Sequence, residues 1–78
     1  MNTTTQKVLV AREFAQPYPA RLGVPAGADR MAVRLTVQEI AGRDYQNETV
    51  WANGVLVVAA QYPAGTDYAA RRVAKWTP

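Results

Sequence analysis

The dipeptide Asn53-Gly54 constrains this chain most, because it separates two strand-like apolar runs, "TVWA" and "VLVVAA". Asn and Gly both tolerate a positive backbone φ, and the pair is a preferred connection of two-residue β-hairpins. The sequence therefore predicts an antiparallel hairpin that turns at Asn53-Gly54.

Both faces of the predicted hairpin carry apolar side chains. Counting outward from the turn gives the pairs Ala52–Val55, Trp51–Leu56, Val50–Val57 and Thr49–Val58. One face then holds Trp51, Leu56 and Val58, and the opposite face holds Val50, Val55 and Val57. A small protein with one core covers only one face of a sheet well, so the other face requires a partner. We therefore predict a protein interface that includes Val50, Trp51, Val55, Leu56 and Val57.

The length of the chain also favours association. A domain of 78 residues buries only ~60% of the surface that its unfolded chain exposes. Disulfides, metals or oligomerisation usually supplement so small a core. The sequence has no Cys and no His, so disulfides, thiolate sites and the commonest zinc ligands are excluded. We expect no metal or cofactor, and a protein partner that is either a second copy or a larger assembly such as a capsid.

Apolar alternation predicts further strands. "KVLVAREF", residues 7–14, fits one strand, and the prolines of "QPYP" then mark a loop. A short strand is expected at residues 20–24. The strongest alternation runs from Met31 to Val37 and predicts a strand that ends near "AGRD", where a polar loop over residues 42–47 begins.

Two stretches of the sequence resemble each other: "VPAGADRMAVRL" at 24–35 and "YPAGTDYAARRV" at 62–73. Pro-Ala-Gly indicates a turn in both, and Asp29 and Asp67 are expected to bond back to turn amides. Residues 67–76 contain good helix formers, but the resemblance to 24–35 favours a strand. The repeat is interpreted as one turn-and-strand unit used twice.

These elements predict an all-β fold: a small single-domain antiparallel β-sandwich or open barrel of five to six short strands, with a short C-terminal helix as the alternative for residues 67–76. Residues 1–6 are expected to form a flexible N-terminal arm, and residues 7–78 a single β domain. We find no signal peptide and no apolar run long enough to cross a membrane. The expected location is a virion or the host cytoplasm.

Catalysis finds little support in the composition. The sequence has no Ser, His or Cys, which excludes the hydrolytic triads. The carboxylates of Asp29 and Asp67 are better explained as turn caps than as an acid–base pair, and no phosphate-binding loop is present. We predict that the chain is not an enzyme and has no small-molecule substrate.

The predicted function is a non-catalytic structural or interaction subunit that packs on itself or on a larger assembly. Rich Ala and Val with Arg in excess of Lys are typical of GC-rich coding sequence and favour a small phage virion component, either a capsid decoration protein or a head or tail accessory protein. A net charge of +3 leaves a basic nucleic-acid-binding module as an alternative. Its contact residues would be Tyr68, Arg71, Arg72, Lys75 and Trp76. A phage-encoded inhibitor of a host complex is the other alternative.

Overall fold

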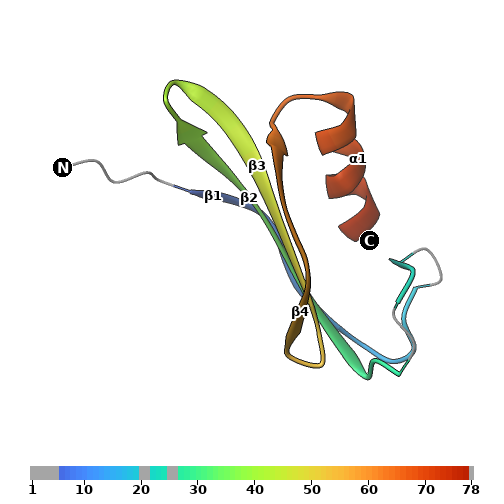
Figure 1. Cartoon of the computed structure of the whole chain (residues 1–78). Coiled ribbons are helices and arrows are strands. Elements are labelled where there is room, and N and C mark those ends of the chain that lie inside the picture. The colour runs from blue at the N-terminus through green and yellow to red at the C-terminus, as the bar shows by residue number, and fades with distance from the viewer. Residues whose placement is uncertain (1–5, 20–21, 25–26, 78) are drawn as a thin grey trace.

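Four strands follow one another across a single antiparallel sheet, and a helix packs on one of its faces. The structure, a computed structural model, describes residues 6–19, 22–24 and 27–77. The elements are β1 (Lys7–Ala15), β2 (Arg30–Ile40), β3 (Arg43–Ala52), β4 (Val55–Pro63) and α1 (Asp67–Trp76). Their order in the sheet is β1-β2-β3-β4, so β1 and β4 are its two edges (Figure 1). The mostly-β prediction is confirmed, but the described part of the chain forms one open sheet with a helix rather than a five- or six-stranded sandwich or barrel.

Two-residue turns connect the last three strands. Ala41 and Gly42 have φ values of 51° and 80°, and Asn53 and Gly54 have 51° and 79°. Positive φ at both central residues matches the right-handed twist of the flanking strands. The Asn53-Gly54 hairpin is therefore confirmed.

The polar loop predicted for residues 42–47 is wrong. Arg43 already pairs with Ile40, and the ladder between β2 and β3 continues without interruption to Met31 and Ala52. The first half of β3 is polar, so its sequence resembles a loop. Because β3 lies between β2 and β4, its backbone groups are paired on both sides, and that pairing outweighs the weak strand propensity of its side chains.

The short strand predicted for residues 20–24 is not confirmed. Ala20 and Arg21 lie outside the described residues, and residues 22–24 contain no strand. Leu22 instead enters the core. The predicted N-terminal arm and the first Pro-Ala-Gly turn fall largely on residues 1–5 and 25–26, which also lie outside the described residues.

The strand favoured for residues 67–76 is wrong, and the alternative of a C-terminal helix is correct. Thr66 is the N-cap residue, since its hydroxyl accepts a hydrogen bond from the Ala69 amide at 3.1 Å. Ala69 and Trp76, seven positions apart, are buried on one side of the helix. The repeat is therefore not a turn-and-strand unit used twice, because its second copy continues into α1. Asp67 pairs with Arg71 one helical turn on, and Asp29 lies beside the start of β2.

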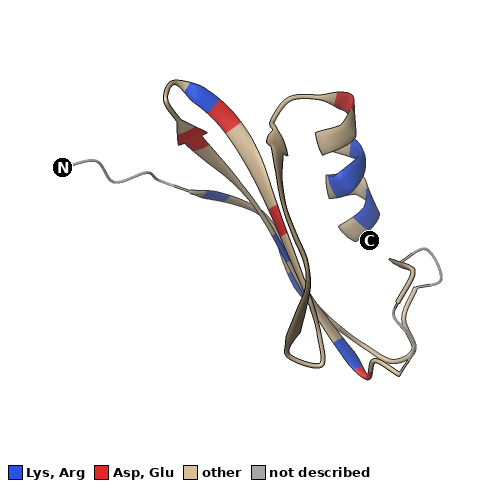
Figure 2. Ribbon diagram, viewed as in Figure 1, with Lys and Arg blue, Asp and Glu red and all other residues tan. Residues whose placement is uncertain are grey.

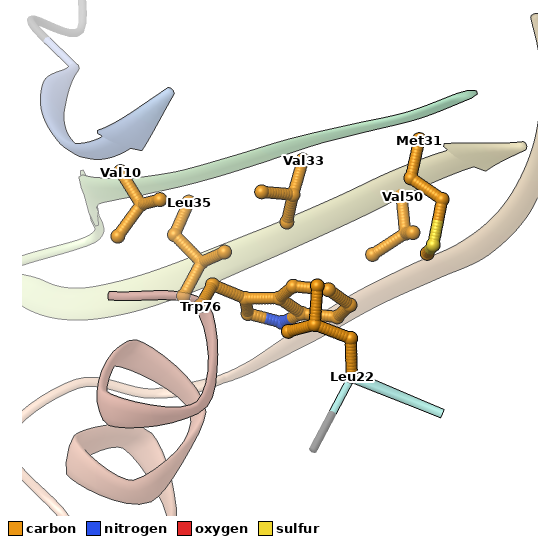
Figure 3. Close-up of a cluster of buried hydrophobic side chains, with 7 residues drawn as sticks. All are labelled: Val10, Leu22, Met31, Val33, Leu35, Val50 and Trp76. Atoms are coloured by element: carbon orange, nitrogen blue, oxygen red, sulfur yellow. The ribbon is translucent and has the colours of Figure 1, made fainter. Parts of the chain in front are cut away.

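The core lies between the sheet and the helix. Its buried members come from β1, β2, β3, α1 and the connection between β1 and β2: Val10, Leu22, Met31, Val33, Leu35, Val50 and Trp76 (Figure 3). The Trp76 indole lies among the aliphatic side chains of the strands and beside Leu22. Leu22, from the connection between β1 and β2, therefore lies on the same face of the sheet as α1.

Asn53 joins the hairpin turn to that connection. Its side-chain carbonyl accepts hydrogen bonds from the amides of Asp29 at 2.9 Å and Arg30 at 3.1 Å, and its side-chain amide donates to the Gly27 carbonyl at 3.4 Å. One residue thus supplies both the positive φ of the turn and the attachment of the segment that enters β2.

We expect substitutions of Asn53 to separate these two roles. Asn53→Gly keeps the turn but loses the side-chain hydrogen bonds, and should lower the free energy of unfolding by about 1 kcal/mol. Asn53→Ala also strains the positive φ and should cost about 2–3 kcal/mol. Asn53→Asp retains the acceptor oxygen and serves as the control. Urea unfolding followed by tryptophan fluorescence measures all three, and equal midpoints for Gly, Ala and wild type would contradict the assignment.

Candidate functional site

Four consecutive aliphatic side chains on β4 are exposed. Their exposed fractions are 64% for Val55, 52% for Leu56, 45% for Val57 and 36% for Val58. We call these four residues the apolar strip. They begin directly after the Asn53-Gly54 turn and lie on an edge strand with no neighbour on its outer side within the described chain. A contiguous exposed apolar group on an open sheet edge is the kind of surface that other protein chains bind.

A β-bulge at Val57 distributes the strip over both faces of the sheet. The predicted pairs Ala52–Val55 and Trp51–Leu56 are confirmed, but Val50 pairs with Val58, and the register shift leaves Val57 as the extra residue. The predicted pairs Val50–Val57 and Thr49–Val58 are therefore wrong. Val58 lies on the face of Val50, while Leu56 lies beside Trp51 on the face away from the helix.

The five residues of the predicted interface have different environments. Val55, Leu56 and Val57 are exposed, and Trp51 is half-buried. Val50 is only 1% exposed and belongs to the core. It is covered because it lies on the inner strand β3, opposite Val33 of β2, on the sheet face that packs against the helix. The hairpin pattern could not distinguish an inner strand from an edge strand.

The two edges of the sheet differ in charge. β4 has the sequence VLVVAAQYP and carries no charged side chain, whereas β1 contains Lys7, Arg12 and Glu13 (Figure 2). Charged side chains on an edge strand oppose pairing with another chain because they would have to be desolvated. By this measure β1 is the protected edge and β4 the unprotected one.

The sheet face away from the helix is polar farther from the Asn53-Gly54 turn. Asn47 connects Gln38 and Gln61 in a row of amides across three strands, with Asn47 donating to Gln38 at 3.2 Å and Gln61 donating to Asn47 at 2.7 Å. Side-chain amides also form hydrogen bonds with water, so this part of the face does not need to be covered by another chain. Within β4, the large exposed apolar side chain of this face is therefore Leu56, near the turn, while Val8 of β1 and Ile40 of β2 are exposed on the same face farther from it.

A buried carboxylate lies under the helix. Glu48 of β3 is 1% exposed and is among the largest fully buried side chains of the described chain. Arg72 donates to both carboxylate oxygens, from Nε to Oε1 at 2.8 Å and from Nη2 to Oε2 at 2.5 Å. Trp76 Nε1 donates to Oε2 at 2.9 Å, and the Tyr62 hydroxyl donates to Oε1 at 2.9 Å. Glu48 thus joins β3, β4 and α1.

Gln46 extends this group of residues. Its side-chain amide donates to the Tyr62 hydroxyl at 3.2 Å and to the Ala69 carbonyl of α1 at 3.0 Å. We call Gln46, Glu48, Tyr62, Arg72 and Trp76 the Glu48 cluster. No buried polar side-chain atom in the described part of the chain lacks a hydrogen-bond partner. A satisfied buried network fixes the position of the elements that contribute to it.

The electrostatics of the Glu48 cluster favour a fixed charge. Desolvation acts to raise the pKa of Glu48, but the hydrogen bonds from Arg72, Trp76 and Tyr62 and the charge of Arg72 outweigh it and hold that pKa below its ordinary value. Burial, together with the hydrogen bond and charge of Glu48, raises the pKa of Tyr62 to about 12 despite the opposing bond from Gln46. The carboxylate is therefore ionised, the phenol protonated, and both are enclosed by their partners. The cluster is suited to holding the helix on the sheet rather than to proton transfer with a substrate.

The predicted nucleic-acid residues do not form one accessible surface. Trp76 is buried in the core, and Arg72 is engaged by Glu48. Arg71 pairs with Asp67, and the Lys75 ammonium lies 5.0 Å from the centre of the Trp76 ring. Tyr68 is exposed but packs edge-to-face on Tyr62 with ring centres 5.0 Å apart. The helix places these side chains around its axis, so residues that are close in the sequence have separate roles.

Little in the sequence indicated the Glu48 cluster. Glu48 lies in the polar half of β3, where an acid normally faces water, and its partners are 14 to 28 positions away. The available signal was the alternation of Gln46 and Glu48 with the core residue Val50, which places all three on one face of a strand. Within the described residues, no group of acidic side chains could hold a metal ion, and no helix is long and apolar enough to cross a membrane.

Comparisons with protein-family models, with curated proteins and with solved structures yield no match to this chain. The candidate site is therefore defined by its own geometry: the apolar strip as the surface for contact, and the Glu48 cluster as the device that fixes the fold beside it.

Removing Arg72 should destabilise the protein far more than removing its neighbour. Arg72→Ala leaves the buried Glu48 carboxylate without its ion pair, and we expect a loss of about 3 kcal/mol in the free energy of unfolding. Arg71→Ala removes only the exposed pair with Asp67 and should cost about 0.5 kcal/mol or less. Chemical denaturation measures both, and equal losses would contradict a structural role for Glu48.

The pKa shifts predict a defined pH dependence. Because the folded pKa of Glu48 is depressed, its contribution to stability is present above its unfolded pKa and is lost as the pH falls through the folded value. The raised pKa of Tyr62 gives the opposite sign, with a contribution that is present below pH 10.0 and lost as the pH rises toward about 12. Glu48→Gln should reduce the loss on the acid side, and Tyr62→Phe the loss on the alkaline side. Unfolding curves across the two pH ranges test this, and unchanged slopes in the variants would contradict it.

Proposed function

We propose that this chain is a non-catalytic assembly subunit that binds another protein chain through the apolar strip. The observation that carries the proposal is the strip itself: four adjacent aliphatic side chains, 36% to 64% exposed, on an uncharged edge strand. Burial of apolar surface contributes roughly 25 cal/mol per Å². The open edge of β4 can add hydrogen bonds of a β-ladder to this contribution.

The rest of the molecule supports a contact role over a catalytic one. Glu48, the most buried titratable group among the described residues, is enclosed by hydrogen bonds from Arg72, Trp76 and Tyr62. The apolar strip on β4 is aliphatic. Aliphatic side chains bind a partner through shape complementarity and desolvation, and they have no group that could take part in a reaction.

As the specific setting we propose a small virion component, such as a capsid decoration protein or a head or tail accessory protein. The support for this setting is compositional, and comes from the predominance of Ala, Val and Arg in a short chain. A surface inhibitor of a host complex would use the same apolar strip, so the identity of the bound protein distinguishes the two. Nucleic-acid binding through the C-terminal segment has less support, because α1 directs Arg72 and Trp76 toward Glu48.

Affinity purification with matched variants tests the contact role. A tagged chain produced in its source, together with an untagged copy, should retain one or more defined proteins. Val57→Lys places a charge in the strip and should abolish this retention. Leu9→Lys is the matched control, because Leu9 is an exposed aliphatic residue at the bulge of the opposite edge strand β1.

Retention by wild type and Leu9→Lys, with loss in Val57→Lys, is the expected result. If all three chains retain the same proteins, or if none is retained by the wild type, the apolar strip is not a protein-binding surface.

A further inference from the structure

We infer that the chain which binds at the apolar strip is a second copy of this protein, joined by antiparallel pairing of β4 with β4. This inference rests on the proposed function and names its partner. The pairing forms a continuous eight-stranded sheet. Its two-fold axis passes between the two β4 strands, at a level between Val55 and Gln61. Because that axis is perpendicular to the sheet, both helices lie on the same face of the joined sheet.

The difference between the two edges supports this geometry. Pairing of β4 with β4 buries the uncharged edge of each copy and leaves the two β1 strands as the outer edges. Those strands carry Lys7, Arg12 and Glu13, which oppose further addition of strands. Pairing of β4 with β1 would instead place these charges in the seam. Each added copy would then leave a free β4 edge at the end of the joined sheet, so the assembly would grow into an open filament. Self-pairing of β4 is therefore the arrangement that closes after two copies.

Charge distribution also permits the contact. The chain carries a net charge of +3, so two copies repel each other over long range. β4 contributes none of that charge, and Arg71 and Arg72 of α1 are paired with Asp67 and Glu48. Two copies can thus meet along β4 without placing an unpaired charge in the seam.

The side chains around β4 explain what the contact would bury. Val58 lies on the helix side, next to Val50 of the core, and Val55 lies on the same face opposite Ala52. The helix reaches β4 through the contact of Tyr68 with Tyr62, near the end of the strand that is far from the turn. The remainder of the helix-side face of β4 is therefore exposed. In the joined sheet, its aliphatic side chains would lie beside those of the second β4 and pack against them as cross-strand neighbours.

Sedimentation equilibrium gives the first test. We expect a mass of twice 8.5 kDa for the wild type at micromolar concentrations. Val57→Lys should raise the dissociation constant of the dimer by about 100-fold or more, because two like charges meet in the seam. Leu9→Lys should leave it unchanged. A wild-type chain that remains a monomer at millimolar concentration would overturn the inference, as would equal weakening by both variants.

Single cysteines give a second test that does not depend on the stability of Val57→Lys. The sequence has no native Cys, so each variant carries one thiol. In a two-fold antiparallel pair, only residues near the axis bring their own copies within the Cα separation of about 4.4–6.8 Å that a disulfide requires. We expect covalent dimers from one or two neighbouring positions among Leu56→Cys, Val58→Cys, Ala59→Cys, Ala60→Cys and Gln61→Cys.

Glu13→Cys on β1 is the control and should remain monomeric under the same mild oxidation. Covalent dimers from Glu13→Cys but from no position of β4 would overturn the inference. If the affinity purification retains a foreign protein at the strip and no untagged copy, this inference fails while the proposed function stands.

Discussion

The buried charge of Glu48 determines how the two layers of this protein meet. Moving a carboxylate out of water costs several kcal/mol unless the protein replaces its hydration completely. Here the replacement comes from Arg72 and Trp76 on the helix and from Tyr62 on β4. Other placements of α1 would deprive the carboxylate of the donors from Arg72 and Trp76, so one position of the helix is favoured over its neighbours. For a core with seven buried apolar members in the described chain, this specificity supplements the contribution of packing.

Local chemistry predicted the elements whose form depends on a few adjacent residues. The Asn53-Gly54 turn and the alternation from Met31 to Val37 were sufficient to place a hairpin and a central strand correctly. Residues 67–76 form a helix rather than the strand that the repeated Pro-Ala-Gly turn predicts, because the helix propensity of Ala and Arg and the cap provided by Thr66 determine the element that follows the turn. A turn of one type can precede either a strand or a helix, so likeness of turns carries little information about the element after the turn.

The candidate site was predictable only in part, for a related reason. Sequence alternation shows that a strand has two apolar faces, but exposure depends on which neighbours cover them. Val50 and Val58 pair with each other, yet one is buried on an inner strand and the other is exposed on an edge. Local sequence patterns could not predict the hydrogen bonds of Glu48, because these bonds join residues that are 14 to 28 positions apart.

That separation along the chain has a consequence for how the molecule folds. The two hairpins joined by Ala41-Gly42 and Asn53-Gly54 contact close neighbours in sequence and can form with a low loss of chain entropy. The donors of the helix reach Glu48 only where the sheet presents that carboxylate, and without the helix the carboxylate would keep its water and the inner face of the sheet would be open. Formation of the water-free interior is therefore coupled to docking of the helix, because Trp76 completes the buried cluster and Arg72 replaces the water around Glu48.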